Sequence, residues 1–310
     1  MKAARLESFG QASNLSVKEV SKPHPRPADL LVRVVASGVN PIEWKIRSGA
    51  MGGALRRPLP VTLGWECAGV VEQVGAEVTS FTVGDEVYGY TEFSRDGTHA
   101  EYVSVDASQM ARKPASLSFP QAAAVPMTGQ AAWSLLEAAG PVAGRRALIH
   151  GAGGSVGHWL VQLAGQAGAS VVATVSGADI DSVLALGANE AIDYQKQRFE
   201  DVGSVDIVFD LVGGDTQTRS WALLPKGGLL LSIANPPDEA LAKTAGATGK
   251  FIFTQPRGTV LAQIAAAIDA GRLRPLAVDS VRPLADVAAV HAAAEAGTLR
   301  GKTVLSVALS

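Results

Sequence analysis

A short apolar run that ends in a cluster of glycines is the feature that most constrains what this 310-residue chain can fold into. The run covers residues 146–150, and the glycines that follow it are Gly151, Gly153, Gly154 and Gly157. Apolar residues at positions 156, 160, 163 and 164 then fall on one face of a helix. The segment therefore predicts a strand, a tight turn and a helix in direct succession.

A turn of this kind is suited to binding an anion. The free backbone N–H groups at a helix N-terminus and the helix macrodipole both favour negative charge there. Glycine lets the backbone approach a pyrophosphate because it has no Cβ. The spacing through Gly151, Gly154 and Gly157 is GxxGxxG, whereas the dinucleotide fingerprint is GxGxxG. Taken alone, the segment fits either a phosphate-binding turn or an ordinary connection between strand and helix.

The sequence around this turn alternates between strands and helices. Near-continuous apolar runs predict strands that are buried on both sides, and helical periodicity occurs between them. The predicted strands cover residues 146–150, 170–175, 205–210, 228–233 and 251–253, and the predicted helices include 156–166 and 180–186. This alternation predicts an α/β domain of the Rossmann type, with a doubly wound parallel sheet.

The remainder of the chain has a different character. Residues 1–115 contain short β runs separated by Gly and Pro, which predicts a partly closed, irregular β-barrel. A final strand at 301–307 follows the nucleotide-binding segment, and we expect it to return to the barrel. We therefore predict a barrel domain made of residues 1–118 and 256–310, and a dinucleotide-binding domain made of residues 119–255.

Composition narrows the classes of function. Hydrophobic residues make up 47% of the chain and charged residues 18%, which is typical of a globular protein. The net charge of −2 provides no electrostatic footprint for nucleic acid or an acidic membrane. Cys67 is the only cysteine, which excludes an intrachain disulfide and a multi-cysteine zinc site. Without a signal-peptide pattern or an apolar run of ~18 residues, we expect a cytoplasmic enzyme with a small-molecule substrate.

Four motifs make the chain similar to a known family. Residues 39–49 resemble the pattern VNPxDxKxRxG, residues 63–71 resemble GxExxGxV, and residues 122–133 resemble AAxxPxxxxTA. With the glycine-rich turn, these motifs resemble the medium-chain dehydrogenase/reductase superfamily, in its zinc-independent, quinone-oxidoreductase-like branch. The resemblance extends over essentially the whole chain. It implies a GroES-like barrel domain beside the Rossmann-type domain.

The resemblance also bears on metal binding. Zinc alcohol dehydrogenases of the superfamily place Cys and His ligands at three points, which here fall on Asn40, Trp65 and Met127. None of these is a good zinc ligand, because zinc sites are built from Cys, His and carboxylate side chains. The cysteine-rich lobe that holds a structural zinc is also missing. The resemblance therefore implies that no metal is bound.

Candidate catalytic residues follow from the same motifs. The resemblance places Asn40 beside the nicotinamide, where it would hydrogen-bond the substrate carbonyl, although an Asn before a proline also forms turns. Thr128 matches a residue that meets the nicotinamide carboxamide, and its alternative is a hydroxyl bonded to its own helix. Lys45 and Met51 stand where relatives carry tyrosines. If it is buried, Lys45 is the candidate proton donor; otherwise it is an exposed lysine, and water supplies the proton.

The cofactor is expected to be NADPH, with NADH as the alternative. Ser176 stands where an acidic residue would hold the ribose of NAD, and the resemblance places Tyr194 against the adenosine end. Lys196 lies within reach of a 2′-phosphate. Asp179 and Asp181 argue the other way, because a nearby carboxylate would repel that phosphate.

The remaining candidate residues form two sets. The full cofactor-binding set is Gly151, Gly153, Gly154, Ser155, Val156, Gly157, Ser176, Tyr194, Lys196, Val212, Ile233, Phe253 and Lys302. Lys302 belongs to a terminal Gly-Lys pair, where it approaches the cofactor or caps the strand. The expected walls of the substrate pocket are Trp44, Met51, Trp65 and Phe93. The resemblance also implies a homodimer formed through the strand at residues 251–253.

The sequence therefore predicts an NADPH-dependent oxidoreductase. It would transfer a hydride, without a metal, to a quinone, an activated carbonyl or a conjugated alkene. One alternative is an enoyl-thioester reductase, which the missing tyrosines and the lack of a basic patch disfavour. Another is a non-catalytic NADPH-binding protein that acts as a sensor or structural component.

Overall fold

The computed structural model describes residues 1–55, 57–299 and 301–307. The chain divides into two compact units: Met1–Met127 with Gln255–Ser310, and Thr128–Thr254. The predicted boundary after residue 118 falls too early. Helix α2 (Phe119–Ala123) packs against strands β3 and β5, so it belongs to the first unit.

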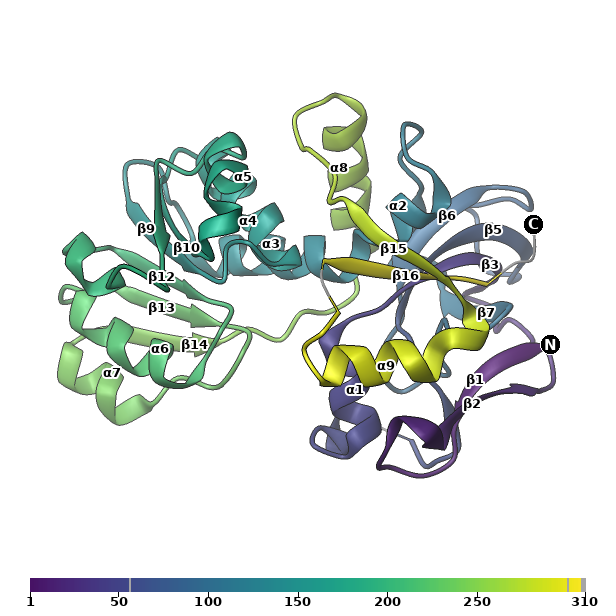
Figure 1. Cartoon of the computed structure of the whole chain (residues 1–310). Coiled ribbons are helices and arrows are strands. Elements are labelled where there is room, and N and C mark those ends of the chain that lie inside the picture. The colour runs from purple at the N-terminus through teal and green to yellow at the C-terminus, as the bar shows by residue number, and fades with distance from the viewer. Residues whose placement is uncertain (56, 300, 308–310) are drawn as a thin grey trace. The chain divides into compact units, whose positions relative to one another are not determined.

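The first unit is built mainly from two sheets (Figure 1). The smaller sheet has the order β2-β1-β4, and the larger has the order β15-β16-β3-β5-β6-β8, with β7 paired to β3. Its strands are β1 (Lys2–Leu6), β2 (Leu15–Glu19), β3 (Asp29–Gly38), β4 (Val61–Thr62), β5 (Glu66–Val74), β6 (Glu86–Tyr90), β7 (Tyr102–Asp106), β8 (Met110–Arg112), β15 (Val278–Pro283) and β16 (Lys302–Ser306). Besides α2, its α-helices are α1 (Pro41–Ser48), α8 (Gly258–Asp269) and α9 (Val287–Glu295).

The last strand of the chain pairs with one of the first. Strand β16 runs antiparallel to β3, with Val304 opposite Gly38 and Ser306 opposite Ala36. The core of the unit draws on the whole length of its sequence, because Leu6, Trp65 and Leu305 belong to one buried cluster. This pairing brings residues near 302 beside residues near 40.

The second unit contains a six-stranded parallel sheet with the order β11-β10-β9-β12-β13-β14. Its strands are β9 (Arg146–His150), β10 (Ser170–Val175), β11 (Glu190–Asp193), β12 (Ile207–Asp210), β13 (Leu229–Ser232) and β14 (Thr248–Phe251). Its helices are α3 (Pro126–Ala139, which begins at the boundary), α4 (Ser155–Gln166), α5 (Ile180–Ala185), α6 (Gly214–Ser220) and α7 (Glu239–Ala245). Figure 1 shows α4 and α5 on one side of the sheet and α6 and α7 on the other. The predicted doubly wound fold is thus confirmed.

The strand order explains where a ligand can bind. From β9 the chain moves outward to β10 and β11, and then returns to β12 on the other side of β9. In open α/β sheets, ligands bind at the carboxyl ends of strands where the order reverses in this way. The glycine-rich turn follows β9 and therefore lies at this switch point.

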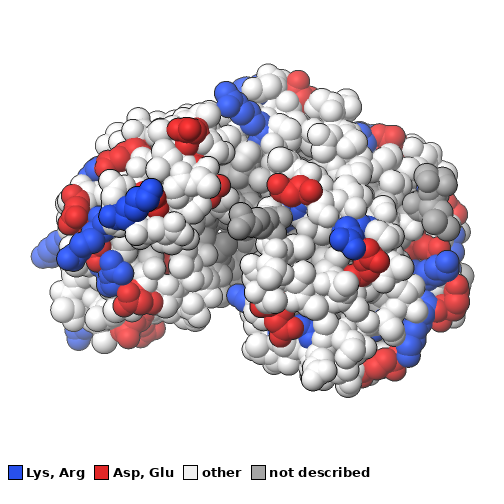
Figure 2. Space-filling model, viewed as in Figure 1, with Lys and Arg blue, Asp and Glu red and all other residues white. Residues whose placement is uncertain are grey.

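The surface carries charges of both signs. Figure 2 shows acidic and basic side chains interspersed on the visible face of both units, without an extended patch of one sign. Within the described part of the chain, no helix combines the length and the apolar character that crossing a membrane requires.

Candidate active site

The turn after β9 leaves the first N–H groups of α4 open. Gly151 has a φ of 71°, which a residue with a Cβ rarely adopts, and the N–H of Gly154 bonds to the carbonyl of Gly151. Gly154 is the N-cap of α4, and among the described residues no side chain caps this helix. The N–H groups of Ser155, Val156 and Gly157 therefore lack an intrahelical acceptor and can receive an anion.

Each glycine of the turn has its own reason. A Cβ on Gly157 would lie 2.5 Å from both the Cα and the carbonyl oxygen of Ala152, so only glycine allows α4 to pack against the turn. A Cβ on Gly151 would lie 3.1 Å from Val212. Gly153 and Gly154 are exposed, so their backbone is accessible to a ligand. The turn thus satisfies the geometry of a pyrophosphate site despite its unusual spacing.

The ends of β10 and β11 bring three predicted adenosine-end residues to one edge. Val175 and Asp193 are paired in register, so Ser176 and Tyr194 follow neighbouring strands. Tyr194 is 58% exposed, and Lys196 reaches Asp193 at 3.4 Å while remaining largely exposed. These residues therefore lie at the carboxyl edge of the parallel sheet, where open α/β folds bind their ligands.

A carboxylate that the sequence marked as unfavourable lies at the same edge. Asp179 accepts a hydrogen bond from the hydroxyl of Ser176 at 2.5 Å. A Cβ on Gly153 would lie only 2.9 Å from Asp179 Oδ2, which places this carboxylate directly beside the glycine-rich turn. Asp181, in contrast, is exposed in the first turn of α5.

Asp210, which the sequence did not single out as a functional residue, organises the loops at the opposite side of the switch point. Its Oδ1 accepts from the N–H groups of Val212 and Gly213 at 3.0 and 2.7 Å. Its Oδ2 accepts from Gln217 Nε2 and Ser232 Oγ at 2.8 and 2.7 Å. One buried carboxylate therefore holds together the loops that carry Val212 and Ile233. The sequence does contain a signal that could have identified Asp210: an aspartate at the end of a buried strand, shortly before two glycines.

A predicted catalytic residue and a predicted cofactor-binding residue of this unit, Thr128 and Phe253, differ in exposure. Thr128 is buried, and its hydroxyl accepts a hydrogen bond from Trp159 Nε1 at 3.1 Å. Phe253 is half-exposed beyond the edge strand β14.

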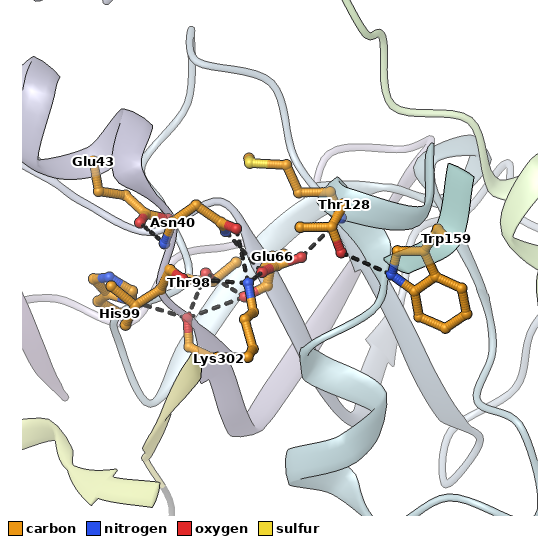
Figure 3. A network of polar contacts seen from close by, with 11 residues as sticks. Asn40, Glu43, Glu66, Thr98, His99, Thr128, Trp159 and Lys302 are labelled. Atoms are coloured by element: carbon orange, nitrogen blue, oxygen red, sulfur yellow. Dashed lines mark hydrogen bonds and ion pairs between the residues drawn. The ribbon is translucent and has the colours of Figure 1, made fainter. Parts of the chain in front are cut away.

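In the barrel unit, three buried side chains converge from three elements (Figure 3). Asn40 is the N-cap of α1, Glu66 begins β5 and Lys302 begins β16. Lys302 Nζ lies 2.5 Å from Glu66 Oε1, 2.7 Å from Asn40 Oδ1 and 3.2 Å from the carbonyl of Val39. Asn40 Nδ2 donates to Glu66 Oε1 at 2.7 Å. The three side chains are at most 5% exposed.

The main chain is shaped around this cluster. The N–H of Met127 donates to Glu66 Oε2 at 2.8 Å. A Cβ on Gly38 would lie 2.2 Å from Glu66 Oε1, so glycine is required at the end of β3. The hydroxyl of Ser37 bonds to both Thr98 and the Nδ1 of His99, and Thr98 also donates to the carbonyl of Glu66.

Several buried ionisable groups surround the cluster. Burial raises the pKa of Glu43 to about 8, although its carboxyl group accepts the N–H of Asn40. Burial lowers the pKa of His291 to about 3 and holds the pKa of His99 well below its ordinary value. At neutral pH these side chains are therefore uncharged, and Lys302 and Glu66 form the ion pair of the cluster.

Three predicted roles in this unit need correction. Lys302 was predicted to approach the cofactor or to cap its strand, but its ammonium has three donors and the three acceptors named above satisfy them. Trp65 was predicted to line the substrate pocket, but it is fully buried in the core, edge-on to Phe93 with ring centroids 4.6 Å apart. Lys45 lacks the full burial that its role as proton donor requires; it is only partly buried, with Nζ 5.9 Å from the ring of Trp44.

The other predicted pocket residues remain available to a ligand. Met51 is 37% exposed, and Trp44 and Phe93 are partly buried. Phe9, which sequence reasoning missed, is 42% exposed and packs on the Gly49–Gly52 segment beside Met51. No sequence motif identifies Phe9, because its contact with the Gly49–Gly52 segment depends on how the chain folds back.

Comparisons with known proteins agree with this architecture. A family model described as "Alcohol dehydrogenase GroES-like domain" matches residues 26–115, and one described as "Zinc-binding dehydrogenase" matches residues 186–305. The mouse mitochondrial NAD(P)H oxidoreductase RTN4IP1 is 32% identical, over 91% of this chain and 82% of its own length. The tomato 2-methylene-furan-3-one reductase is 34% identical, over 98% and 79%.

Two further proteins resemble the chain over nearly its full length. Human quinone oxidoreductase is 31% identical, over 94% of this chain and 93% of its own. The solved structure of the quinone oxidoreductase from Coxiella burnetii superposes with a TM-score of 0.91 at 31% identity, covering 99% of both chains. A GroES-like barrel and a Rossmann-type unit in one chain define an oxidoreductase that works with a dinucleotide. This chain belongs to the medium-chain dehydrogenase/reductase superfamily, as its motifs predicted.

The residues present do not fit the zinc that one family description implies. The three points at which related alcohol dehydrogenases carry ligands hold an amide, a buried indole and a thioether, from Asn40, Trp65 and Met127. The ammonium of Lys302 lies 2.7 Å from Asn40 Oδ1, so a cation already occupies this place. Among the described residues, no cluster of three or more His, Cys, Asp or Glu side chains is arranged to hold a metal.

Proposed function

We propose that this protein is a metal-free, NADPH-dependent reductase that transfers a hydride to a quinone, an activated carbonyl or a conjugated alkene. The names of relatives support this range of acceptors. They include quinone oxidoreductase, 2-methylene-furan-3-one reductase and the Arabidopsis NADPH-dependent alkenal/one oxidoreductase, which is 32% identical over 89% of this chain. All three kinds of acceptor have an electron-poor π system that includes a carbonyl group or is conjugated with one.

The buried Lys302–Glu66 pair beside Asn40 is the observation that carries the metal-free proposal. The ammonium of Lys302 lies 2.5 Å from the carboxylate of Glu66 and balances the negative charge that a metal cation would otherwise balance. A divalent metal here would face the positive charge of Lys302 and a set of poor ligands. The site must therefore polarise its substrate with hydrogen bonds rather than with a Lewis acid.

The second unit supplies the groups that would hold the cofactor. The open N–H groups of Ser155, Val156 and Gly157 fit the pyrophosphate, and the loops with Val212 and Ile233 lie at the same edge of the sheet. Bound NADPH supplies the hydride. Ser176 can bond to the ribose, Tyr194 can pack on the adenine, and Lys196 is exposed and able to approach a 2′-phosphate. Asp179 opposes that phosphate, so we expect NADH to be accepted as well.

Asn40 is suited to hold the oxygen of the acceptor. A carboxamide nitrogen has two hydrogens, and Nδ2 directs one of them to Glu66. The other can donate to a carbonyl oxygen and stabilise the negative charge that develops there during hydride transfer. Because Lys45 is only partly buried, we propose that water delivers the proton. A conjugated or quinoid acceptor tolerates this because its charge is delocalised.

The test is consumption of NADPH by the purified protein with an ortho-quinone, a conjugated enone and an unactivated ketone. We expect turnover of the quinone and the enone, at least a hundredfold less with the ketone, and no loss of rate after treatment with a chelator. Lys45→Gln should keep the rate within about twofold, and Asn40→Ala should lower kcat by about 100-fold, the cost of losing one such donor. Metal-dependent turnover would refute the proposal. Tight NADPH binding without turnover of any acceptor would instead indicate a binding protein.

The edge strand β14 supports a homodimer. Its residues are mostly exposed, and Phe251 and Phe253 present large apolar side chains that are 41% and 50% exposed. β14 is the last strand in the order of its sheet, and a sheet edge offers backbone N–H and C=O groups that favour pairing with another strand. We propose that two copies join their sheets through β14.

A further inference from the structure

We propose that Lys302 is a positioning residue that fixes which way the carboxamide of Asn40 faces, so that an N–H rather than a C=O is presented to the acceptor. This inference rests on the proposed function, because it assigns a purpose to the free N–H of Asn40. Lys302 does not itself touch the acceptor or the cofactor.

The chemistry of the three groups determines the orientation of the amide. An ammonium can only donate hydrogen bonds, so the atom of Asn40 that faces Lys302 at 2.7 Å must be the oxygen. An ionised carboxylate can only accept, so the atom that faces Glu66 at 2.7 Å must be the nitrogen. Rotating the amide by 180° would place NH₂ against an ammonium and C=O against a carboxylate. Both contacts would be repulsive in a buried site.

After the cluster has formed its internal hydrogen bonds, one N–H donor is left over. Lys302 uses its ammonium on Val39, Asn40 and Glu66, and Glu66 Oε2 accepts the N–H of Met127. Asn40 Nδ2 gives one hydrogen to Glu66, and none of the described residues accepts the other. The ammonium also draws charge from Oδ1, which makes the remaining N–H a stronger donor.

The pairing of strands makes this contact possible. Val304 of β16 lies opposite Gly38 of β3, and the N–H of Val39 bonds to the carbonyl of Thr303, which extends the ladder. Continuing the antiparallel register by two residues places Lys302 opposite Asn40. Both residues are thus held by backbone pairing, and their side chains need no long reach.

The orientation can be observed directly, without measuring activity. The chain has four asparagines, Asn14, Asn40, Asn189 and Asn235. Selective ¹⁵N-asparagine labelling therefore gives four side-chain amide nitrogens, each with a pair of proton signals, and Asn40→Asp identifies the pair of interest. We expect the two Asn40 Nδ2 protons to be well separated in shift and slow to exchange. Lys302→Met should bring them together or raise their exchange rate several-fold.

A double variant separates positioning from charge balance. Lys302→Met alone leaves Glu66 buried without a partner, so the stability of the protein would also fall. In Lys302→Met/Glu66→Gln no charge is uncompensated. The new amide at position 66 must offer its oxygen to the N–H of Met127, and so it offers NH₂ to Asn40. This favours the reversed orientation of the Asn40 amide.

We expect the double variant to fold and to bind NADPH within twofold of the wild type, while kcat for the quinone falls at least tenfold. Lys302→Arg should retain more of kcat than Lys302→Met, because a guanidinium, like an ammonium, only donates hydrogen bonds. Lys22→Met removes a half-exposed lysine–glutamate pair of the same unit and should change neither kcat nor the amide spectrum. A folded double variant with wild-type kcat and an unchanged Asn40 signal would overturn the proposal. If the wild type reduces no acceptor, the proposed function fails, yet the amide spectrum still decides whether Lys302 orients Asn40.

Discussion

Replacing Gly157 with alanine should damage both stability and cofactor binding, whereas the same replacement at Gly165 in the same helix should not. At Gly157 the new Cβ would lie 2.5 Å from two backbone atoms of Ala152. Non-bonded carbons are at optimal separation at about 3.5–4.0 Å, so α4 would have to move by about 1 Å. Overpacking of this size costs about 1–3 kcal/mol, and the better helix propensity of alanine offsets up to about 1 kcal/mol of it.

Gly165 provides the matched control. A Cβ there would meet only the carbonyl oxygen of Gly187, at 3.4 Å, which is ordinary contact. Gly165→Ala should therefore gain up to about 1 kcal/mol from helix propensity alone. The two variants should differ by roughly 2 kcal/mol in free energy of unfolding, or by about 6 °C in Tm at about 3 °C per kcal/mol.

The assay is thermal and guanidinium unfolding of both variants, with amide hydrogen exchange in β9 and β10 to identify the transition of the second unit. Isothermal titration with NADPH reports the second effect. Moving α4 displaces the N–H groups of Ser155 and Val156, so we expect the Kd of Gly157→Ala to rise at least tenfold, with Gly165→Ala unchanged. Equal stabilities and equal Kd values for the two variants would show that the turn is not packed as described.

Three more predictions address other parts of the chain. Asp179→Asn should raise the ratio of kcat/KM for NADPH over NADH by about tenfold, equivalent to ~1.4 kcal/mol of relieved repulsion at a half-buried carboxylate. The control Asp181→Asn should change this ratio less than twofold. Equal effects of the two variants would contradict the placement of Asp179. Phe251→Glu should convert a dimer into a monomer by light scattering, and a dimer that survives must use another surface. Glu43 is neutral in the folded protein because burial raises its pKa to about 8, while the unfolded chain loses that proton above about 4.5. The free energy of unfolding should therefore fall as pH rises from about 4.5 to 8. Urea unfolding at a series of pH values measures this, and Glu43→Gln should flatten the dependence of the midpoint on pH in this range. An equally steep dependence in the variant would exclude Glu43 as its cause.

The sequence was informative wherever the physical cause is local. Period-2 and period-3.6 patterns report which face of a segment is buried, so strands β9, β10, β12 and β13 and helices α4 and α5 were predicted within a few residues. Strand β11 and helices α6 and α7 were not predicted. The glycines at 151 and 157 reflect a positive φ and a close approach within a single turn. The division of the chain was harder to predict, because the place of α2 depends on its packing against β3 and β5 rather than on its own sequence.

Only the tertiary structure decided what the side chains near Asn40 do. Lys302 is 262 residues from Asn40 in the sequence, and no local pattern records that the pairing of β16 with β3 brings them together. The burial of single side chains could not be predicted either: Trp65 was expected in a pocket wall and lies in the core, and Lys45 was a proton-donor candidate and is only partly buried. The sequence by itself determined the Rossmann-type framework and the glycine-rich turn after β9, since short-range periodicity and glycine sterics encode both. The folded chain determined the lysine–glutamate–asparagine cluster, since its charges are stabilised only when strands distant in sequence pair and exclude water.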